Sequence, residues 1–345
     1  MPLLEVLLEY NMDFKPTSKF AYVVGACYKY VPELCALLNS LHAVENRFDV
    51  HVIGIDLPDE FTSQFDKLYT TRRLEIGEGG LSSSYRPSCG YHVIHHGIQE
   101  DEIQAGRGVS EIVCRKRYWY AGEIGKEYQA MCVLDADMVF IRNPWQFFEI
   151  AAQTGFVLGA SKEQNKVYDH EHHHVDGRWL IDPEFCNDKD LCNAPLFIDA
   201  RKYEQALKDS WLWFIEHGFW APDMDAMNIA FLHHHMYHMI VKLAGVQWLG
   251  TNEQMLKPYM KACKRSDGLL WTDSGLEIWS IHGHYYHEKW RTQQLLNRKG
   301  CIKGRLDGSE KAYGDAAGAL DVLYRAFLDA LNGVITVEHK DYRCG

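Results

Sequence analysis

The chain has 345 residues, of which 47% are hydrophobic and 13% aromatic, a composition typical of a well-packed globular protein. Its 36 Lys and Arg residues against 47 Asp and Glu residues give a net charge of −11, and the one dense basic cluster is CRKRYW at 114–119, so nucleic acid is disfavoured as a partner. No run of 18 or more apolar residues occurs, so we expect no membrane span.

The first half of the chain alternates strand and helix signals. Runs rich in β-branched and aromatic residues predict strands at 20–26 and 49–56, and helical spacing of apolar residues predicts helices at 31–44 and 58–69. This order predicts an α/β fold in which helices cover a parallel sheet.

A Gly- and Ser-rich stretch at 77–109 predicts a long loop of the kind that forms lids, and a helix at about 110–121 follows it. The next apolar run, AMCVLDADMVF at 130–140, predicts a strand that carries two aspartates one residue apart.

The second half is less regular, with strand signals at 155–160, 194–200 and 277–286 and helix signals at 201–218, 223–245 and 315–333. Since no internal repeat or low-complexity linker separates these elements, we expect a single domain over 1–345. Its core would span about 18–292, and 293–345 would form a helical C-terminal extension.

The ten cysteines include no CxxC pair, which argues against a zinc ribbon or a dithiol site, and several lie in apolar runs where cysteine acts as a small apolar residue. The N-terminal segment lacks the basic start of a signal peptide. Together these features predict a cytoplasmic protein with reduced thiols.

Two histidine-rich segments invite a metal interpretation. HEHHH at 170–174 fits the H-E-x-x-H pattern of zinc peptidases, but that pattern needs a helix and the flanking residues show no helical periodicity, so we interpret it as a polar loop. HHHMYH at 233–238 lies in an apolar-rich helix, where we expect its histidines to pack or cap.

The two aspartates of the 130–140 run have a more specific interpretation. Residues i and i+2 of a strand share a face, so Asp135 and Asp137 would project together if the chain stays extended. Two carboxylates at the carboxyl end of a strand make half of a site for Mg²⁺ or Mn²⁺, and such an ion can bridge a diphosphate. The alternative is a strand end with two solvated aspartates in a turn, and the spacing alone does not decide between them.

The longer segment AMCVLDADMVFIRNPWQFF (130–148) resembles the DxD segment of GT-A glycosyltransferases. It is most similar to glycosyltransferase family 8, a retaining family that contains glycogenin and the bacterial lipopolysaccharide galactosyltransferases. In that family an apolar strand leads into D-x-D, a short apolar run and then an Asn or Asp that is often followed by Pro, and Asn143 and Pro144 fill those places here.

Two further segments match the family in the same order. AYVVGACYKYVPELCALLNSL (21–41) resembles the first strand and helix, whose junction holds the nucleotide base, which implies roles for Ala26, Tyr28 and Tyr30. CNAPLFIDARKY (192–203) resembles the N-[AS]-G strand beside the donor sugar; Asn193 and Ala194 match it, and Pro195 replaces the Gly.

The segment PDMDAMN (222–228) resembles the family's D-Q-D-x-x-N segment, with Asp223, Asp225 and Asn228 matching. Met224 replaces the Gln, and a thioether cannot donate a hydrogen bond, which puts the family's stereochemical outcome in question.

The segment IHGHYYHEKW (281–290) resembles the family's C-terminal H-x-x-G-x-x-K-P-W segment, of which His282, Lys289 and Trp290 match and the Gly and Pro do not. In the family that His completes the metal site and the Lys contacts the diphosphate.

The family also has a Lys or Arg before the DxD strand that approaches the diphosphate or sugar. The cluster at 114–119 offers Arg115, Lys116 and Arg117, which point in different directions on one helix. Arg115 suits the family's spacing because it precedes Trp119 by four residues. The alternative is a solvated basic face.

The resemblance implies a GT-A-like, mixed but mostly parallel sheet flanked by helices, and a metal-dependent glycosyltransferase that acts with retention. The expected partners are a UDP-sugar donor and an unknown acceptor, which is a glycan, a protein or a small molecule. The implied metal, Mn²⁺ or Mg²⁺, would be held by Asp135, Asp137 and His282. The implied donor-binding residues are Ala26, Tyr28, Tyr30, Arg115, Asp135, Ala136, Asp137 and Lys289, and the candidate catalytic residues beside the sugar are Asn193, Asp223 and Asp225.

Two other functions stay open. A nucleotidyltransferase shares an α/β core and an acidic metal site, but it usually has a Gly-rich phosphate loop near the first strand, where VVGACYKY offers one glycine, Gly25. A nucleotide-sugar-binding protein without turnover would explain Met224 and Pro195.

Overall fold

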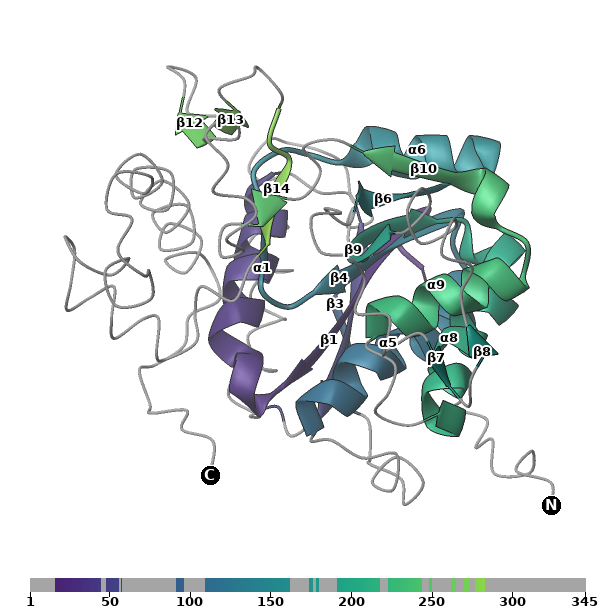
Figure 1. The fold of residues 1–345 in the computed structure, drawn as a ribbon. Coiled ribbons are helices and arrows are strands. Elements are labelled where there is room, and N and C mark those ends of the chain that lie inside the picture. Colours follow the sequence, from purple (N-terminus) through teal and green to yellow (C-terminus); the bar gives the residue numbers. More distant parts are fainter. Residues whose placement is uncertain are drawn as a thin grey trace, which may run out of the picture.

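The computed structural model describes residues 16–44, 48–55, 57, 91–95, 109–161, 174–175, 178–179, 191–217, 223–243, 248–249, 262–264, 270–272 and 277–282. In this part of the chain, seven strands form a central sheet in the order β10-β6-β9-β4-β1-β2-β3 (Figure 1). Their bounds are β1 Phe20–Cys27, β2 Asp49–Ile55, β3 Tyr91–His95, β4 Ala130–Asp135, β6 Val157–Ser161, β9 Leu191–Ile198 and β10 Ile240–Leu243. Neighbouring strands are parallel except at β9, which runs antiparallel to β4 and β6.

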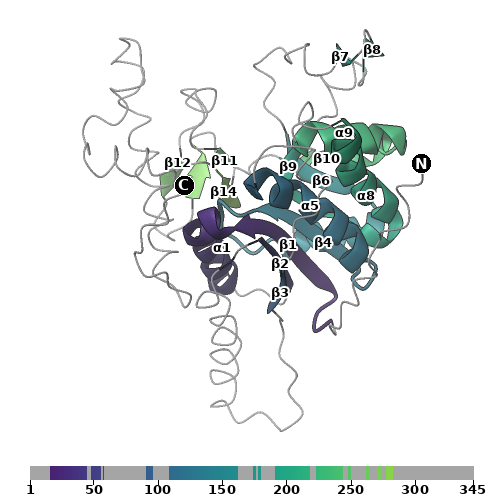
Figure 2. The same ribbon diagram turned by 90° about the horizontal axis from the view of Figure 1, so that it is seen from below.

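Helices cover both faces of this sheet. The helical elements are η1 Tyr28–Tyr30, α1 Val31–Ala43, α5 Val109–Gly125, α6 Trp145–Thr154, α8 Ala200–His217, α9 Asp223–His233 and η3 Tyr237–Met239. α1 and α6 pack on one face, and α5, α8 and α9 on the other (Figures 1 and 2). The predicted α/β fold, with a mixed and mostly parallel sheet flanked by helices, is confirmed.

β1 shows how the sequence supports two cores. Its side chains alternate between the faces, so Ala21 and Val23 pack with α5 while Tyr22 and Val24 pack with α1 and α6. Every residue of β1 is buried, which is typical of a central parallel strand covered on both sides.

The remaining described strands form smaller sheets. β5 Met138–Phe140, β14 Ser280–His282 and β11 Trp248–Leu249 make a three-stranded sheet in the order β11-β14-β5. Two short antiparallel pairs are β7 His174–Val175 with β8 Arg178–Trp179, and β12 Ala262–Lys264 with β13 Leu270–Thr272.

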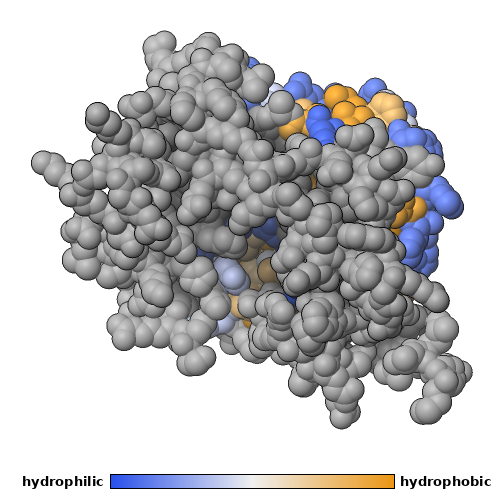
Figure 3. Space-filling view, in the orientation of Figure 1, coloured by the Kyte–Doolittle hydropathy of each residue, from blue (hydrophilic) through white to orange (hydrophobic). Residues whose placement is uncertain are grey.

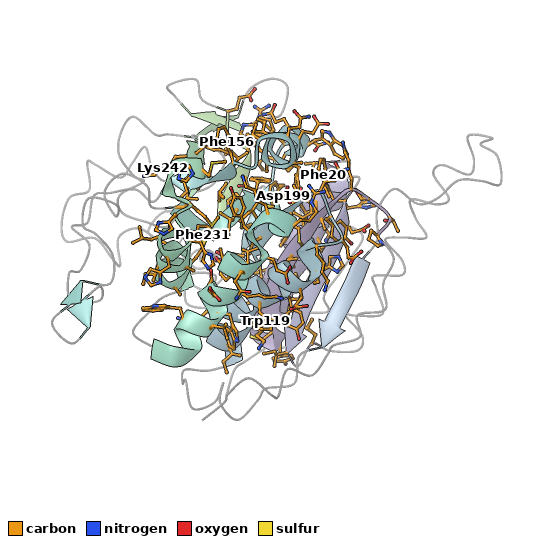
Figure 4. All side chains as sticks on the ribbon, turned by 90° about the vertical axis from the view of Figure 1, so that its right-hand side faces the viewer. Phe20, Trp119, Phe156, Asp199, Phe231 and Lys242 are labelled. Carbon is orange, nitrogen blue, oxygen red and sulfur yellow. The ribbon has the colours of Figure 1, made fainter. Side chains whose placement is uncertain are left out.

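An aromatic cluster joins α6 to the sheet. The ring of Phe148 stacks on Phe48 at 4.6 Å and on Phe20, which is labelled in Figure 4, at 5.2 Å between centroids. The Oδ1 of Asn143 accepts a hydrogen bond of 3.0 Å from the Trp145 N–H at the start of α6, and Gly155, with φ 69°, ends the helix in the left-handed conformation that glycine tolerates best.

Two sequence predictions need correction. The loop predicted over 77–109 contains β3, because Tyr91–His95 pairs in parallel with β2 at the edge of the sheet. The helix predicted over 223–245 ends at His233; His235 is left-handed with φ 54°, and Ile240–Leu243 instead joins β6 as an edge strand.

Other predictions agree with the described residues or lie outside them. The strands predicted at 20–26, 49–56, 155–160 and 194–200 and the helices at 31–44, 110–121 and 201–218 correspond to β1, β2, β6, β9, α1, α5 and α8. The helices predicted at 58–69 and 315–333 lie outside the described residues, as does most of HEHHH, of which His174 begins β7.

The described cysteines behave as apolar residues. Cys27, Cys35 and Cys132 are buried and, like the half-buried Cys114, free of disulfides. Burial raises the pKa of the Cys35 and Cys132 thiols above their ordinary value, which keeps them protonated.

Apolar and polar residues mingle where α6 and β10 reach the surface (Figure 3). Among the described residues, the exposed large apolar side chains are Ile150 on α6 and Leu212 on α8. Since these helices cover opposite faces of the sheet, the two side chains do not form one patch. No helix in the described ranges has both the length and the apolarity that a membrane crossing requires.

Candidate functional site

The candidate site lies where β1 and β4 end side by side. The two strands are parallel, and Gly25 is the register partner of Asp135, the last residue of β4. β1 continues for two residues through Ala26 and then turns into η1, which carries Tyr28 and Tyr30. The carboxyl edge of an open α/β sheet is where such folds bind ligands.

The Asp135-Ala136-Asp137 segment does not stay extended. β4 ends at Asp135, Ala136 and Asp137 form a turn, and β5 begins at Met138 in the three-stranded sheet. The expectation that both aspartates share one strand face is therefore wrong, because the chain leaves the central sheet between them to pair with β14. Each carboxylate instead has its own surroundings.

Asp135 forms an ion pair with Arg117 of α5. The Arg117 side chain is fully buried, and the Asp135 side chain is 13% exposed. The family spacing predicts Arg115 as the residue that contacts the donor; Arg115 is also buried, and its donor contact stays a prediction. Helical spacing from the fully buried Val113 indicates Arg117, because residues four apart lie on one helix face.

Asp137 is buried at 7% exposure and lies near Tyr30. Burial raises the pKa of the half-buried Tyr30 phenol well above its ordinary value, and the neighbouring Cys114 and Asp137 raise it further. The phenol therefore stays protonated and can donate a hydrogen bond, whereas a phenolate could not. The methyl group of Ala26 is buried in the core beside α1, so only its backbone is available to a ligand.

The backbone of His282 lies next to this turn. In the antiparallel pair of β5 and β14, His282 is the register partner of Met138, the residue after Asp137. The Ile141 N–H extends the pairing with a hydrogen bond of 2.9 Å to the Trp279 carbonyl oxygen. The side chain of His282 is outside the described part, and among the side chains inside it no three His, Cys, Asp or Glu residues surround a common metal position.

The candidate sugar-binding residues lie on β9 and α9. Because β9 is antiparallel to β4 with Leu196 opposite Val133, its start, which holds Asn193, lies at the same edge of the sheet as Asp135. Asp223 and Asp225 begin α9. The side chains of Asn193, Asp223 and Asp225 are outside the description, as is all of Lys289, so their roles stay predictions.

Asn228 explains why β9 and α9 stay together. Its Oδ1 accepts a hydrogen bond of 3.2 Å from the Leu191 N–H, and its Nδ2 donates one of 3.0 Å to the Leu191 carbonyl oxygen. The buried amide thus replaces a strand partner at the start of β9, which gives this matched motif residue a structural role.

The chain resembles solved structures of glycosyltransferases, the class that the sequence motifs resemble. The galactosyltransferase LgtC, in complex with donor and acceptor sugar analogs, matches with 12% sequence identity and a TM-score of 0.49 over 88% of this chain and 95% of its own. The bifunctional glycosyltransferase WbbM matches with 12% identity and a TM-score of 0.49 over 81% of this chain, which spans 47% of the WbbM chain. Mouse xyloside xylosyltransferase 1 matches with 13% identity and a TM-score of 0.42, over 77% of this chain and 98% of its own. No protein-family model and no curated protein sequence matches this chain.

Proposed function

We propose that this chain is a metal-dependent glycosyltransferase that moves a sugar from a nucleotide-sugar donor to an acceptor. The observation that carries the proposal is the convergence of the Asp135-Ala136-Asp137 turn, the η1 turn and the backbone of His282 at the carboxyl edge of the sheet. This convergence joins the three segments that resemble the base-binding and metal-binding parts of family 8 glycosyltransferases.

The residues at this edge fit Mn²⁺ or Mg²⁺. The carboxylates of Asp135, 13% exposed, and Asp137, 7% exposed, supply the oxygen ligands that both ions prefer. Asp135, Asp137 and His282 would hold the ion, which when bound supplies positive charge to the departing nucleoside diphosphate.

The other residues bind and orient the donor. The backbone at Ala26 and the rings of Tyr28 and Tyr30 would contact the base. The protonated Tyr30 phenol would donate a hydrogen bond to an oxygen atom of the nucleotide-sugar. Lys289 and Arg115 would contact the diphosphate, while Asn193, Asp223 and Asp225 would line the sugar. By resemblance the donor is a UDP-sugar and the configuration is retained; the departing phosphate then takes the acceptor proton, so no strong protein base is required.

Release of UDP from a panel of UDP-sugars, with and without Mn²⁺, tests this function. We expect turnover of one donor only with the metal, and a loss of at least about 100-fold in Asp137→Ala, since the variant removes a ligand from the centre that stabilises developing charge. Asp209→Ala is the matched control, because Asp209 of α8 is a surface carboxylate that pairs with His234, the residue after α9. Its turnover should equal that of the native chain.

The other outcomes separate the alternatives. Metal-dependent UDP binding without turnover of any donor would favour a nucleotide-sugar-binding protein, which Met224 and Pro195 in place of the family residues would explain. If the chain neither binds UDP with the metal nor turns over any donor, the proposed metal site is refuted.

A further inference from the structure

The ion pair between Arg117 and Asp135 has an unusual setting. The guanidinium side chain of Arg117 is fully buried inside the layer between α5 and the sheet, and Asp135 is the first carboxylate of the candidate metal site. A buried ion pair contributes little net stability, because desolvation offsets most of the attraction. A role in fixing the Asp135 carboxylate explains the pair better than a role in stability.

A close contact at Gly25 sets how near α5 lies to the strand ends. A Cβ atom at Gly25 would overlap the main-chain carbonyl oxygen of Val113 and lie 3.5 Å from the Cα of Cys114. Gly25 is also the register partner of Asp135. The main chain of α5 therefore rests directly on β1 beside the carboxylate that Arg117 contacts.

The direction of helix side chains completes the geometry. Arg117 follows Val113 by four residues, so both lie on the face of α5 that meets the sheet. Side chains on a helix point back toward its N-terminus, which lets the long Arg117 side chain reach from one turn further along to the level of Gly25 and Asp135.

The other end of α5 is seated as closely. A Cβ atom at Gly125 would overlap the Cβ of Ala200 and lie 2.7 Å from the Sδ of Met131. α5 thus lies in close contact with β1 at Gly25, and with α8 and β4 at Gly125.

We propose that Arg117 is the positioning residue for the first carboxylate of the metal site, and that Gly25 is the contact that lets it act. Arg117 holds Asp135 in one orientation before the ligand arrives, and the site loses metal affinity when that orientation is lost. This inference rests on the proposed metal-dependent function, and it assigns Arg117 no contact with the reacting atoms.

Direct Mn²⁺ binding, measured by the electron paramagnetic resonance signal of the free ion with and without UDP, tests the proposal on the full chain. We expect Arg117→Met and Gly25→Ala to weaken Mn²⁺ binding by about 10- to 100-fold, the usual effect of removing a group that orients a metal ligand. Arg117→Lys should bind Mn²⁺ more tightly than Arg117→Met, because it keeps the positive charge. It should still bind less tightly than the native chain, because it lacks the planar guanidinium group.

Gly125→Ala is the control for packing. It introduces a clash of similar severity at the far end of α5, so it should lower the melting temperature while the folded protein keeps native Mn²⁺ affinity. If Arg117→Met does not fold, Arg117→Lys and Gly25→Ala carry the test, with folding checked by circular dichroism.

Each result has a definite meaning. Native or tighter Mn²⁺ binding by the folded Arg117 and Gly25 variants would overturn the positioning role and leave the proposed function standing. A native chain that binds no Mn²⁺, alone or with UDP, would overturn both the metal site and the role of Arg117.

Discussion

Asn228 is a side chain whose chemistry, rather than its size, suits its position. A primary amide can donate and accept at once, and Asn228 does both with the backbone of Leu191 inside the protein. No apolar side chain of the same volume can satisfy both backbone groups. The residue therefore holds α9, which begins with the candidate catalytic aspartates Asp223 and Asp225, against β9.

Replacing Asn228 should be costly for that reason. We expect Asn228→Leu, which keeps the branched shape of the side chain, and Asn228→Ala each to lower the free energy of unfolding by about 2–4 kcal/mol, because two buried backbone groups lose their partners. Asn143→Ala, which removes an exposed amide that accepts from the Trp145 N–H, should cost about 0.5–1 kcal/mol. Urea unfolding of the three variants measures these losses, and an Asn228→Leu variant as stable as the native chain would show that the two hydrogen bonds to Leu191 contribute nothing.

At the scale of elements, a single serine connects α1 to β5. The Ser40 hydroxyl donates a hydrogen bond of 2.7 Å to the Leu37 carbonyl oxygen of its own helix and accepts one of 3.0 Å from the Phe140 N–H. Because β5 follows the Asp135-Ala136-Asp137 turn directly, this link fixes where the chain goes after it leaves the central sheet.

Ser40→Ala should therefore destabilise the protein more than an ordinary helix serine would. The variant leaves the buried Phe140 N–H without its acceptor, and we expect a cost of about 1–3 kcal/mol. Ser210 is the matched control, since it is also buried and donates 2.8 Å to the carbonyl oxygen of Ala206 in its own helix. Ser210→Ala should change stability by less than about 0.5 kcal/mol, because alanine is the better helix former. Equal losses in the two variants, measured by urea unfolding, would contradict the role of Ser40.

The elements that could be predicted are those whose local pattern agrees with their final place. The apolar, β-branched runs of β1 and β2 predict strands in any context, and the sheet uses them as such. Ile240–Leu243 could not be predicted, because a short apolar run after a helix fits a longer helix equally well until a sheet edge pairs with it. The strand Tyr91–His95 could not be predicted either, because it lies within a Gly- and Ser-rich stretch that predicts a loop.

Some features of the candidate site could likewise be predicted from the sequence, and others could not. The family resemblance implies that Asp135, Asp137 and His282 lie together. In the structure His282 is the register partner of Met138, the residue after Asp137, and the shared metal stays a prediction. The turn at Ala136 and Asp137 could not be predicted, because it forms where the chain leaves the central sheet for β5, which belongs to a second sheet. Helical spacing indicates Arg117 as the partner of Asp135 only once Val113 is known to face the sheet, and the contact of Val113 with Gly25 is a tertiary contact that no local pattern reports.

At the scale of the whole molecule, the two ends of the central sheet have different chemistry. The carboxyl end carries the candidate site, and the opposite end carries a buried polar network around Asp49, the first residue of β2. The Tyr128 hydroxyl donates 2.8 Å to Asp49 and accepts from the Nε2 of His51 at 2.8 Å, and the Thr17 N–H donates 2.8 Å to the same carboxylate. The network fastens the segment before β1 and the segment before β4 to one edge.

Because of this network, the free energy of unfolding should fall as the pH rises above 10. Burial raises the pKa of the Tyr128 phenol well above its ordinary value of 10.0, and the Asp49 carboxylate that accepts its hydrogen bond raises it further. Below pH 10 the phenol is protonated in both the folded and the unfolded chain. Above pH 10 only the unfolded chain releases the proton, so the free energy of unfolding should fall by about 1.4 kcal/mol per pH unit through this group.

Comparing the native chain with Tyr128→Phe isolates that contribution. At pH 8 the variant should be less stable by about 1–3 kcal/mol, because the buried Asp49 carboxylate loses a donor. Between pH 8 and pH 11 the difference in free energy of unfolding between the two chains should narrow by about 1.4 kcal/mol, since phenylalanine has no proton to release. Urea unfolding at pH 8, 10 and 11 measures the difference in free energy of unfolding between the two chains. The difference between their absorbances at 295 nm reports tyrosinate at Tyr128. A gap that stays constant, or tyrosinate absorbance at Tyr128 that precedes the loss of circular dichroism, would show that the folded protein does not hold this proton more tightly than the unfolded chain.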